Sequence, residues 1–184
     1  LQPFESVGVG KAAVERVGSA RRIWKDDRIL VRYSSTAKAP ELAAEPEGDI
    51  DRDIRTVTFA QAAKPLVRLH YYASHPQTFC CDGRVSADFV CAARAGMERA
   101  DGVAQVYFTG CGGDVTVGKY NTGLETERAA LAGRMQAGMR ASIAATRYEK
   151  VGRMQWRYED LRLPAKAAPS SAPASARPTK FVSF

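Results

Sequence analysis

The sequence contains no run of about eighteen apolar residues, the length that a helix needs to cross a bilayer. It therefore predicts no transmembrane segment. The chain also begins at Leu1 rather than at methionine, and no basic stretch followed by an apolar one opens it. We expect any signal peptide or upstream segment to lie outside these residues, and the 184 residues to be a fragment of a longer protein.

Cysteine pairs with the Cys-x-x-Cys spacing are missing as well. The four cysteines are Cys80, Cys81, Cys91 and Cys111, and no two of them form a Cys-x-x-Cys motif. The spacing indicates neither a zinc ribbon nor a thioredoxin-like redox pair. A disulfide between the neighbours Cys80 and Cys81 would be strained. Unmodified thiols and pairing across loops remain the two alternatives, and the cellular compartment stays open.

Basic residues outnumber acidic ones, which gives a net charge of +7. The segment 164–184 contains Lys166, Arg177 and Lys180 and no acid, so a charge of +4 remains for residues 1–163. In that part, lysine and arginine are interleaved with aspartate and glutamate instead of forming a stripe. This distribution is typical of a solvated surface, and we expect no nucleic-acid partner.

Composition divides the chain into one domain and a tail. With 45% hydrophobic and 26% charged residues, the chain has the balance of one ordinary globular domain, which we assign to 1–163. From Pro164 the sequence PAKAAPSSAPASARPTKFVSF has no apolar periodicity, which predicts a disordered tail over 164–184. The polar segment 34–53 predicts a loop or a short helical turn.

The middle of the chain carries three strand patterns. Residues 54–59 (IRTVTF) and 66–72 (LVRLHYY) predict two strands joined by a turn, which makes an antiparallel hairpin. In the second strand Val67, Leu69 and Tyr71 share one face, and His70 points to the other. Residues 103–109 (VAQVYFT) predict a third, nearly continuous apolar strand.

Two helix patterns flank the strand 103–109 in the sequence. The first helix is expected to begin at a Ser86 cap, and its apolar residues recur at helical spacing: Phe89, Val90, Ala93 and Met97. The second follows a capping-box spacing of Thr122 and Glu125 and runs to about Thr146. Its core face is formed by Leu131, Met135, Met139 and Ile143. The alternation predicts an α/β fold: a mixed or largely parallel sheet with flanking helices, plus the hairpin.

A glycine-rich loop after the strand 103–109 comes close to a phosphate-binding motif. From Gly113 to Lys119 it reads Gly, four residues, Gly-Lys, but Tyr120 stands where a P-loop has serine or threonine. The following helix also begins too late, so we expect no nucleotide site. The loop glycines are Gly110, Gly112, Gly113 and Gly118. They either let the chain turn sharply or let its backbone approach a ligand, and both interpretations remain open.

His75 lies in the loop after the strand 66–72. Pro76 follows it and holds its backbone extended, at the end of the strand. In an α/β sheet this end of neighbouring strands collects ligands, so His75 and the glycine-rich loop are expected at one edge. A histidine held there suits a metal ion, and the alternative is a histidine hydrogen-bonded in a turn. We assign His70 to packing or to support of the site.

The segments LHYYASHPQTF, GRVSADF and VYFTGCGGDVTVGKYN, in this order, resemble the neutral/alkaline non-lysosomal ceramidase family in its N-terminal catalytic domain, specifically its divergent bacterial branch. The resemblance is clearest over 54–123. It implies zinc-dependent hydrolysis of the amide of an N-acylated sphingoid base, with His75 of Ala73-Ser74-His75-Pro76 as a zinc ligand. It places Thr116 at the position of the family's serine hydroxyl beside the metal.

The same resemblance implies further site residues. Asp114 accompanies Thr116 in the catalytic loop, and Gly112 and Gly113 line that loop for substrate. Asp88, in Ser86-Ala87-Asp88, matches the family's Ser-x-Asp, although an acid in the first turn of a helix is also explained by the helix dipole. The sequence departs from the family pattern at two positions, with Thr116 for serine and Val117 for proline. These departures point to a substrate that is related to ceramide but not identical with it.

The implied function is that of a fragment of a zinc-dependent amidohydrolase acting on a lipid-like amide. The family draws its other zinc ligands from segments that are not recognisable here, so we expect the fragment alone to be inactive. The alternative is a non-catalytic binding module on the same scaffold that has lost its metal. The resemblance implies a secreted or periplasmic protein, and the oligomeric state is left open.

Overall fold

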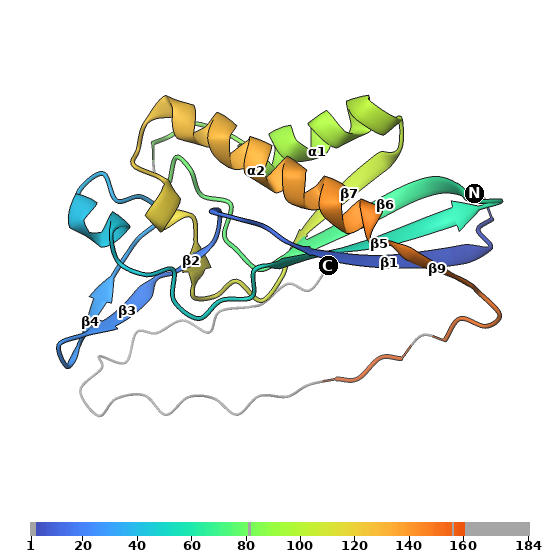
Figure 1. Cartoon of the computed structure of the whole chain (residues 1–184), viewed down its shortest axis with the longest axis horizontal. Helices are drawn as coiled ribbons and strands as arrows, with labels where there is room; N and C mark the ends of the chain where they lie inside the picture. The colour runs from blue at the N-terminus through green and yellow to red at the C-terminus, as the bar shows by residue number, and fades with distance from the viewer. Residues whose placement is uncertain (1–2, 81, 156, 161–184) are drawn as a thin grey trace. The chain divides into compact units, whose positions relative to one another are not determined.

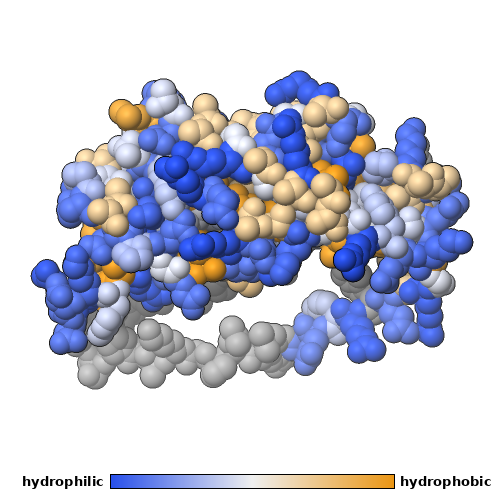
Figure 2. Space-filling model, viewed as in Figure 1, coloured by the Kyte–Doolittle hydropathy of each residue, from blue (hydrophilic) through white to orange (hydrophobic). Residues whose placement is uncertain are grey.

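The computed structural model describes residues 3–80, 82–155 and 157–160. The predicted tail, 164–184, lies outside the described residues and stays a prediction. A first compact unit spans Leu1–Gly152, and all helices and strands described below belong to it. No helix in the described part of the chain is long and apolar enough to span a membrane. Polar and charged side chains cover most of the face shown in Figure 2.

A five-stranded mixed sheet forms the centre of the fold (Figure 1). Its strand order is β7, β6, β5, β1, β9, with the bounds Ala104–Thr109, Lys64–Tyr72, Asp53–Gln61, Ser6–Ala13 and Arg147–Lys150. Only β6 and β7 run parallel, and the other neighbours are antiparallel. The fold class is therefore confirmed as a mixed sheet, with its parallel pairing confined to the two strands that precede the predicted site.

The predicted hairpin is present as β5 and β6. Ala62 and Ala63 join the two strands, both at positive φ, as a two-residue turn requires when its twist matches that of the strands. The predicted strand 103–109 is present as β7. Because β6 and β7 pair in parallel, with Tyr72 opposite Thr109, the loops that follow both strands leave the sheet at the same edge.

Two helices cover one face of the sheet (Figure 1). α1 spans Asp88–Asp101 and α2 spans Glu125–Ala144; they pack on each other and on the strands. Seven of their eight predicted core residues are buried, namely Phe89, Val90, Ala93, Met97, Leu131, Met135 and Met139, and the eighth, Ile143, is partly buried. α2 lies so close to β1 that a Cβ added at Gly10 would be 1.9 Å from the carbonyl oxygen of Ser142. Glycine at that position permits the close packing.

Neither helix has the cap that its sequence predicts. α1 begins at Asp88 and α2 at Glu125, with Ala87 and Leu124 in the cap positions and no capping side-chain hydrogen bond. Ser86 instead accepts a hydrogen bond from the amide of Asp88 at 2.9 Å. Thr122 donates to the Glu127 carboxylate at 3.0 Å. Both residues belong to the loops that precede the helices, where hydroxyl side chains stabilise turns equally well.

One face of the sheet is covered by the helices and the other is open in the described part of the chain, and the alternation of residues in the sequence did not show which is which. Val67, Leu69 and Tyr71 share a face as predicted, but the helices cover the opposite one, where His70 is fully buried. The uncovered face is the apolar one; it carries the stacked rings of Tyr71 and Phe108, whose centroids are 4.9 Å apart. No described helix or strand packs on that face.

A smaller region combines elements from the segment after β1 with elements from the loop after β7. It contains a short ladder of β2 with β8, the β3–β4 hairpin and two single-turn 3-10 helices, η1 and η2. Their bounds are Ser19–Ala20, Val115–Thr116, Arg22–Lys25, Arg28–Val31, Pro40–Ala43 and Gly118–Tyr120. The predicted loop or helical turn over 34–53 contains η1, and its last residue begins β5.

Candidate active site

The loop after β6 and the glycine-rich loop after β7 meet, as the sequence predicts. The amide of His75 donates to the carbonyl oxygen of Val115 at 2.9 Å, and His75 pairs with Thr116 in an isolated parallel bridge. A Cβ added at Gly112 would lie 3.0 Å from the amide nitrogen of Ser74, so the loops touch closely there. The positions of His75 and of the Asp114–Thr116 segment are therefore coupled through the backbone.

The imidazole of His75 is held by the same carbonyl group. Its Nδ1 lies 3.1 Å from the carbonyl oxygen of Val115. Because a carbonyl oxygen can only accept, Nδ1 carries the hydrogen and Nε2 keeps a lone pair. Histidines that bind metals commonly donate their other ring N–H to a backbone carbonyl, which fixes the tautomer and the ring orientation. The second nitrogen, Nε2, thus has the form required of a metal ligand.

Thr116 is 1% exposed, and its hydroxyl is engaged on both sides. It donates to the carbonyl oxygen of Tyr33 at 3.3 Å and accepts from the amide of Gly118 at 3.2 Å. Its own carbonyl accepts from the Ser19 hydroxyl at 3.2 Å. In this arrangement the hydroxyl fixes the loop, and contact with a substrate would require another rotamer.

Asp114 sits at the outer end of the same segment. Its carboxylate accepts from Nε of Arg22 at 2.7 Å, and both side chains are more than one-third exposed. Its backbone carbonyl accepts from the amide of Arg21 at 2.7 Å. Asp114 therefore connects the glycine-rich loop to β3, and its second carboxylate oxygen has no protein hydrogen bond among the described residues.

Gly113 differs from the other loop glycines. A Cβ added there would meet nothing within 4 Å, whereas one added at Gly118 would lie 1.9 Å from the carbonyl oxygen of Tyr33. Gly112 and Gly113 both have ordinary negative φ values. Gly118 and Gly112 are thus explained by close packing of backbone on backbone. Packing does not explain why residue 113 is glycine, so the interpretation that the backbone there approaches a ligand remains.

Asp88 is buried at the start of α1 and adopts a positive φ of 58°. Its carboxylate accepts from the amides of Thr78 at 2.8 Å and Phe89 at 2.7 Å, and also from the Thr78 hydroxyl. These bonds tie the loop after His75 to the helix. Asp88 also lines a cavity of about 260 Å³ together with Pro76, Phe79, Arg84 and Arg128.

Lys119, the lysine of the near P-loop motif, is bound within the protein. Its ammonium group donates to the carbonyl oxygens of Ala43, at 2.7 Å, and Glu45. The glycine-rich loop passes into the short 3-10 helix η2, not into an α-helix with free amide groups. The lysine thus anchors η1 to the loop.

Two buried polar residues that support the site were missed at the sequence level. Asn121 donates to the carbonyl oxygens of Ser34 and Thr78, each at 2.7 Å, and accepts from the amide of Gly123 at 3.1 Å. Arg32 is fully buried and donates to five carbonyl oxygens, of Ala20, Leu42, Glu45, Pro46 and Glu47. A polar residue directly after a glycine-rich loop was the available signal for Asn121, and Arg32 had none.

An apolar cavity of about 560 Å³ lies beside these anchors. Its walls come from the segment 31–42, from residues 78–80, Asp82 and Gly123, and include Val31, Tyr33, Leu42 and Phe79. Asn121 bridges the two walls behind it through Ser34 and Thr78. The volume is in the range of small-molecule sites, which are mostly apolar with a few polar groups.

The donor set for a metal is incomplete in this part of the chain. Among the described residues, no group of three or more histidine, cysteine, aspartate or glutamate side chains could hold an ion. A catalytic zinc ion requires three protein ligands and an open position. His75 fits one of these places, and the remaining ligands would have to come from outside the described residues.

No family model and no curated protein sequence matches the chain. Solved structures similar to it include a ceramidase complexed with C2, with a TM-score of 0.55, and the neutral ceramidase from Pseudomonas aeruginosa, with 0.53. Each is 12% identical and covers 78% of this chain, which spans only 22% and 23% of those chains. The structure thus confirms the resemblance at the level of fold: the chain folds like part of a neutral ceramidase.

Proposed function

We propose that the chain is part of the catalytic domain of a zinc-dependent amidohydrolase that cleaves a lipid-like N-acyl amide, as a ceramidase does. The observation that carries the proposal is the geometry of His75, whose Nδ1–H is fixed by the Val115 carbonyl beside Thr116. The ceramidase-like fold of the chain supports it. Zinc, when bound, would supply a polarised water for attack on the amide carbonyl.

The candidate site residues of this chain would have different roles in the reaction. His75 offers Nε2 to the metal from a ring that cannot rotate without losing its carbonyl partner. Thr116, after a change of rotamer, offers a hydroxyl to the reacting amide. Asp114, with one carboxylate oxygen bound to Arg22, and the uncovered backbone at Gly113 would be open to a substrate. The remaining ligands belong to the rest of a longer protein, of which this chain would form about a quarter.

A non-catalytic binding module is the second candidate. The observation that favours it is the engagement of the two predicted catalytic side chains: Thr116 with Tyr33 and Gly118, and Asp114 with Arg22. A module of this kind would keep the loops and the apolar cavity and would bind an amphipathic ligand without cleaving it.

Zinc content and hydrolysis, measured on the longer protein that contains this chain, separate the two candidates. We expect His75→Ala to lose most of the zinc and the hydrolysis of an N-acyl sphingoid amide, because one of few ligands is removed. His70→Asn is the matched control: it changes the second of the two histidines in this chain and should keep the zinc content of the folded protein. Unchanged zinc in His75→Ala, or no zinc in the parent protein, would leave the binding module.

A further inference from the structure

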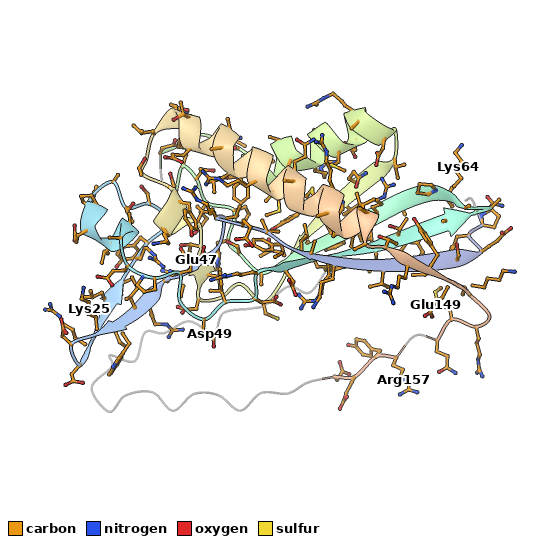
Figure 3. The ribbon with its side chains drawn as sticks, in the orientation of Figure 1. Lys25, Glu47, Asp49, Lys64, Glu149 and Arg157 are labelled. Atoms are coloured by element: carbon orange, nitrogen blue, oxygen red, sulfur yellow. The ribbon has the colours of Figure 1, made fainter. Side chains whose placement is uncertain are left out.

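The β3–β4 hairpin carries a row of large apolar side chains in water. Asp26 and Asp27 close it in a two-residue turn with φ values of 50° and 56°. In the ladder Trp24 pairs with Ile29 and Arg22 with Val31, which places Trp24, Ile29 and Val31 on one face. The other face holds Ile23, which is buried. The hairpin extends from one end of the domain, with Lys25 at its tip (Figure 3).

The exposed row is continuous and large. Trp24 is 70% exposed, Ile29 51%, Val31 39%, and Tyr33, two residues beyond Val31, 64%. We call these four residues the hairpin strip. Single exposed apolar residues are ordinary, but a contiguous row that includes tryptophan and tyrosine marks an interaction surface. No described residue covers it.

The hairpin strip leads into the apolar cavity. Val31 and Tyr33 belong to the strip and also line the cavity of about 560 Å³. The other apolar residues of its lining include Ala37, Leu42 and Phe79. The strip and the cavity thus share two apolar residues, although the cavity lining also includes Ser34, Lys38 and Asp82. This continuity favours a partner that itself contains long apolar chains.

Charge identifies the kind of partner. Arg22 and Lys25 are used in ion pairs with Asp114 and Glu45. Two exposed cations of this region have no ion pair among the described residues: Lys38, which lines the cavity, and Arg28, which pairs with Lys25 on the hairpin face opposite the strip. Tryptophan and tyrosine flanked by arginine and lysine are the side chains that favour the boundary between lipid headgroups and acyl chains. The acidic turn, Asp26 and Asp27, would then stay in water, so that the strip lies flat.

We propose that the hairpin strip docks on the surface of an anionic lipid bilayer, with Trp24 and Tyr33 in the headgroup boundary and the apolar cavity opening toward the acyl chains. Lys38 at the cavity, and the long side chain of Arg28 reaching around the edge of the hairpin, would contact the anionic headgroups. Docking needs neither zinc nor amide cleavage. It therefore stands or falls independently of the proposed hydrolysis.

Tryptophan fluorescence tests the docking directly, because the chain has only two tryptophans. In the chain with Trp156→Phe, Trp24 is the single fluorophore. Vesicles of phosphatidylcholine with phosphatidylglycerol should shift its emission to the blue, and lipids brominated on their acyl chains should quench it. Vesicles of phosphatidylcholine alone should bind more weakly, as should any vesicles at high salt.

Paired variants locate the bound surface. Replacing Trp24 and Ile29 by serine should reduce co-sedimentation with the anionic vesicles by about tenfold or more, because two large apolar groups no longer enter the bilayer. The control replaces Val106 and Phe108, which are exposed on the open sheet face, by serine. It should bind as the parent chain does, and circular dichroism should show that all chains fold alike.

Four outcomes would overturn the proposal. They are unchanged emission of Trp24 with vesicles, undiminished binding of the Trp24 and Ile29 variant, equal loss in the sheet-face control, and shielding of Trp24 from acrylamide before lipid is added. The last would mean that protein covers the strip, either a second copy of the chain or another part of a longer protein. Sedimentation velocity distinguishes these two sources.

Discussion

The hydroxyl of Thr116 lies 3.3 Å from the carbonyl oxygen of Tyr33, a residue whose side chain lines the apolar cavity. This bond joins the loop of the candidate active site to the wall of the cavity. A change at Thr116 therefore acts on the shape of the site as well as on its chemistry, and the two effects have to be measured separately.

Thr116→Ser should preserve both hydrogen bonds and lower the free energy of unfolding by only about 1 kcal/mol, the value of one buried methyl group. Thr116→Ala removes the hydroxyl and leaves the Gly118 amide without its partner, which should cost about 1 to 3 kcal/mol. If the hydroxyl also serves hydrolysis, turnover in Thr116→Ala should fall on the order of a hundredfold, while Thr116→Ser stays active. Urea unfolding and an amide hydrolysis assay on each variant provide the two measurements. Equal turnover in both variants would limit Thr116 to its structural role.

The glycines of the loop offer a matched pair. Gly118→Ala places a Cβ against the Tyr33 carbonyl and should lower the free energy of unfolding by about 1 to 3 kcal/mol, the usual cost of overpacking. Gly113→Ala points its methyl group into open space and should change stability by less than about 0.5 kcal/mol. Thermal unfolding ranks the two variants. A loss of ligand binding in the stable Gly113→Ala chain would favour the interpretation that the loop backbone approaches a ligand.

Alternation and loop chemistry made much of this site predictable. Strand patterns located β5, β6 and β7, and parallel pairing of the last two brings His75 next to Thr116. Alternation also separated His70 from Tyr71, but it could not tell which face the helices cover. The pattern of one strand carries no information about the helix residue that will lie against it, as Ser142 of α2 lies against Gly10 of β1 and Thr56 of β5.

The buried residue Arg32, which supports the site loops, could not be predicted for a related reason. Arg32 is held by backbone carbonyls, most of them in the segment 42–47, and every residue type has a carbonyl. No residue in that segment signals that it will receive a guanidinium group. The missing helix caps follow the same rule: hydroxyls near a helix start can stabilise the preceding loop instead, as Ser86 and Thr122 do.

Lys119→Ala should destabilise the domain without affecting any nucleotide site. The substitution leaves the carbonyls of Ala43 and Glu45 without their shared donor, and we expect a loss of about 1 to 3 kcal/mol in the free energy of unfolding. Calorimetry of the parent chain with magnesium and ATP should show no binding in the micromolar range. Micromolar binding that Lys119→Ala abolishes would revive the P-loop interpretation.

The last prediction concerns acid stability and depends on His70, which is fully buried between Thr56 and Gln105. The Thr56 hydroxyl lies 2.8 Å from Nδ1, and Nε2 lies 2.7 Å from Oε1 of Gln105, an arrangement that suits a neutral ring with its hydrogen on Nε2. Burial lowers the pKa of His70 below its ordinary value of 6.5, and Arg68 nearby lowers it further, against an opposing contribution from the Gln105 bond.

Below a pH of about 6.5 the unfolded chain therefore binds a proton that the folded chain does not. The free energy of unfolding should fall as the pH decreases through that value, by at most about 1.4 kcal/mol per pH unit for this one group. Urea unfolding between about pH 7.5 and pH 5 measures the slope, and His70→Gln, which cannot titrate, supplies the reference. The prediction requires the parent chain to lose more stability than His70→Gln over this range. Parallel profiles would mean that His70 accepts the proton in the folded state, and that Asp101, on the far side of Gln105, compensates the charge.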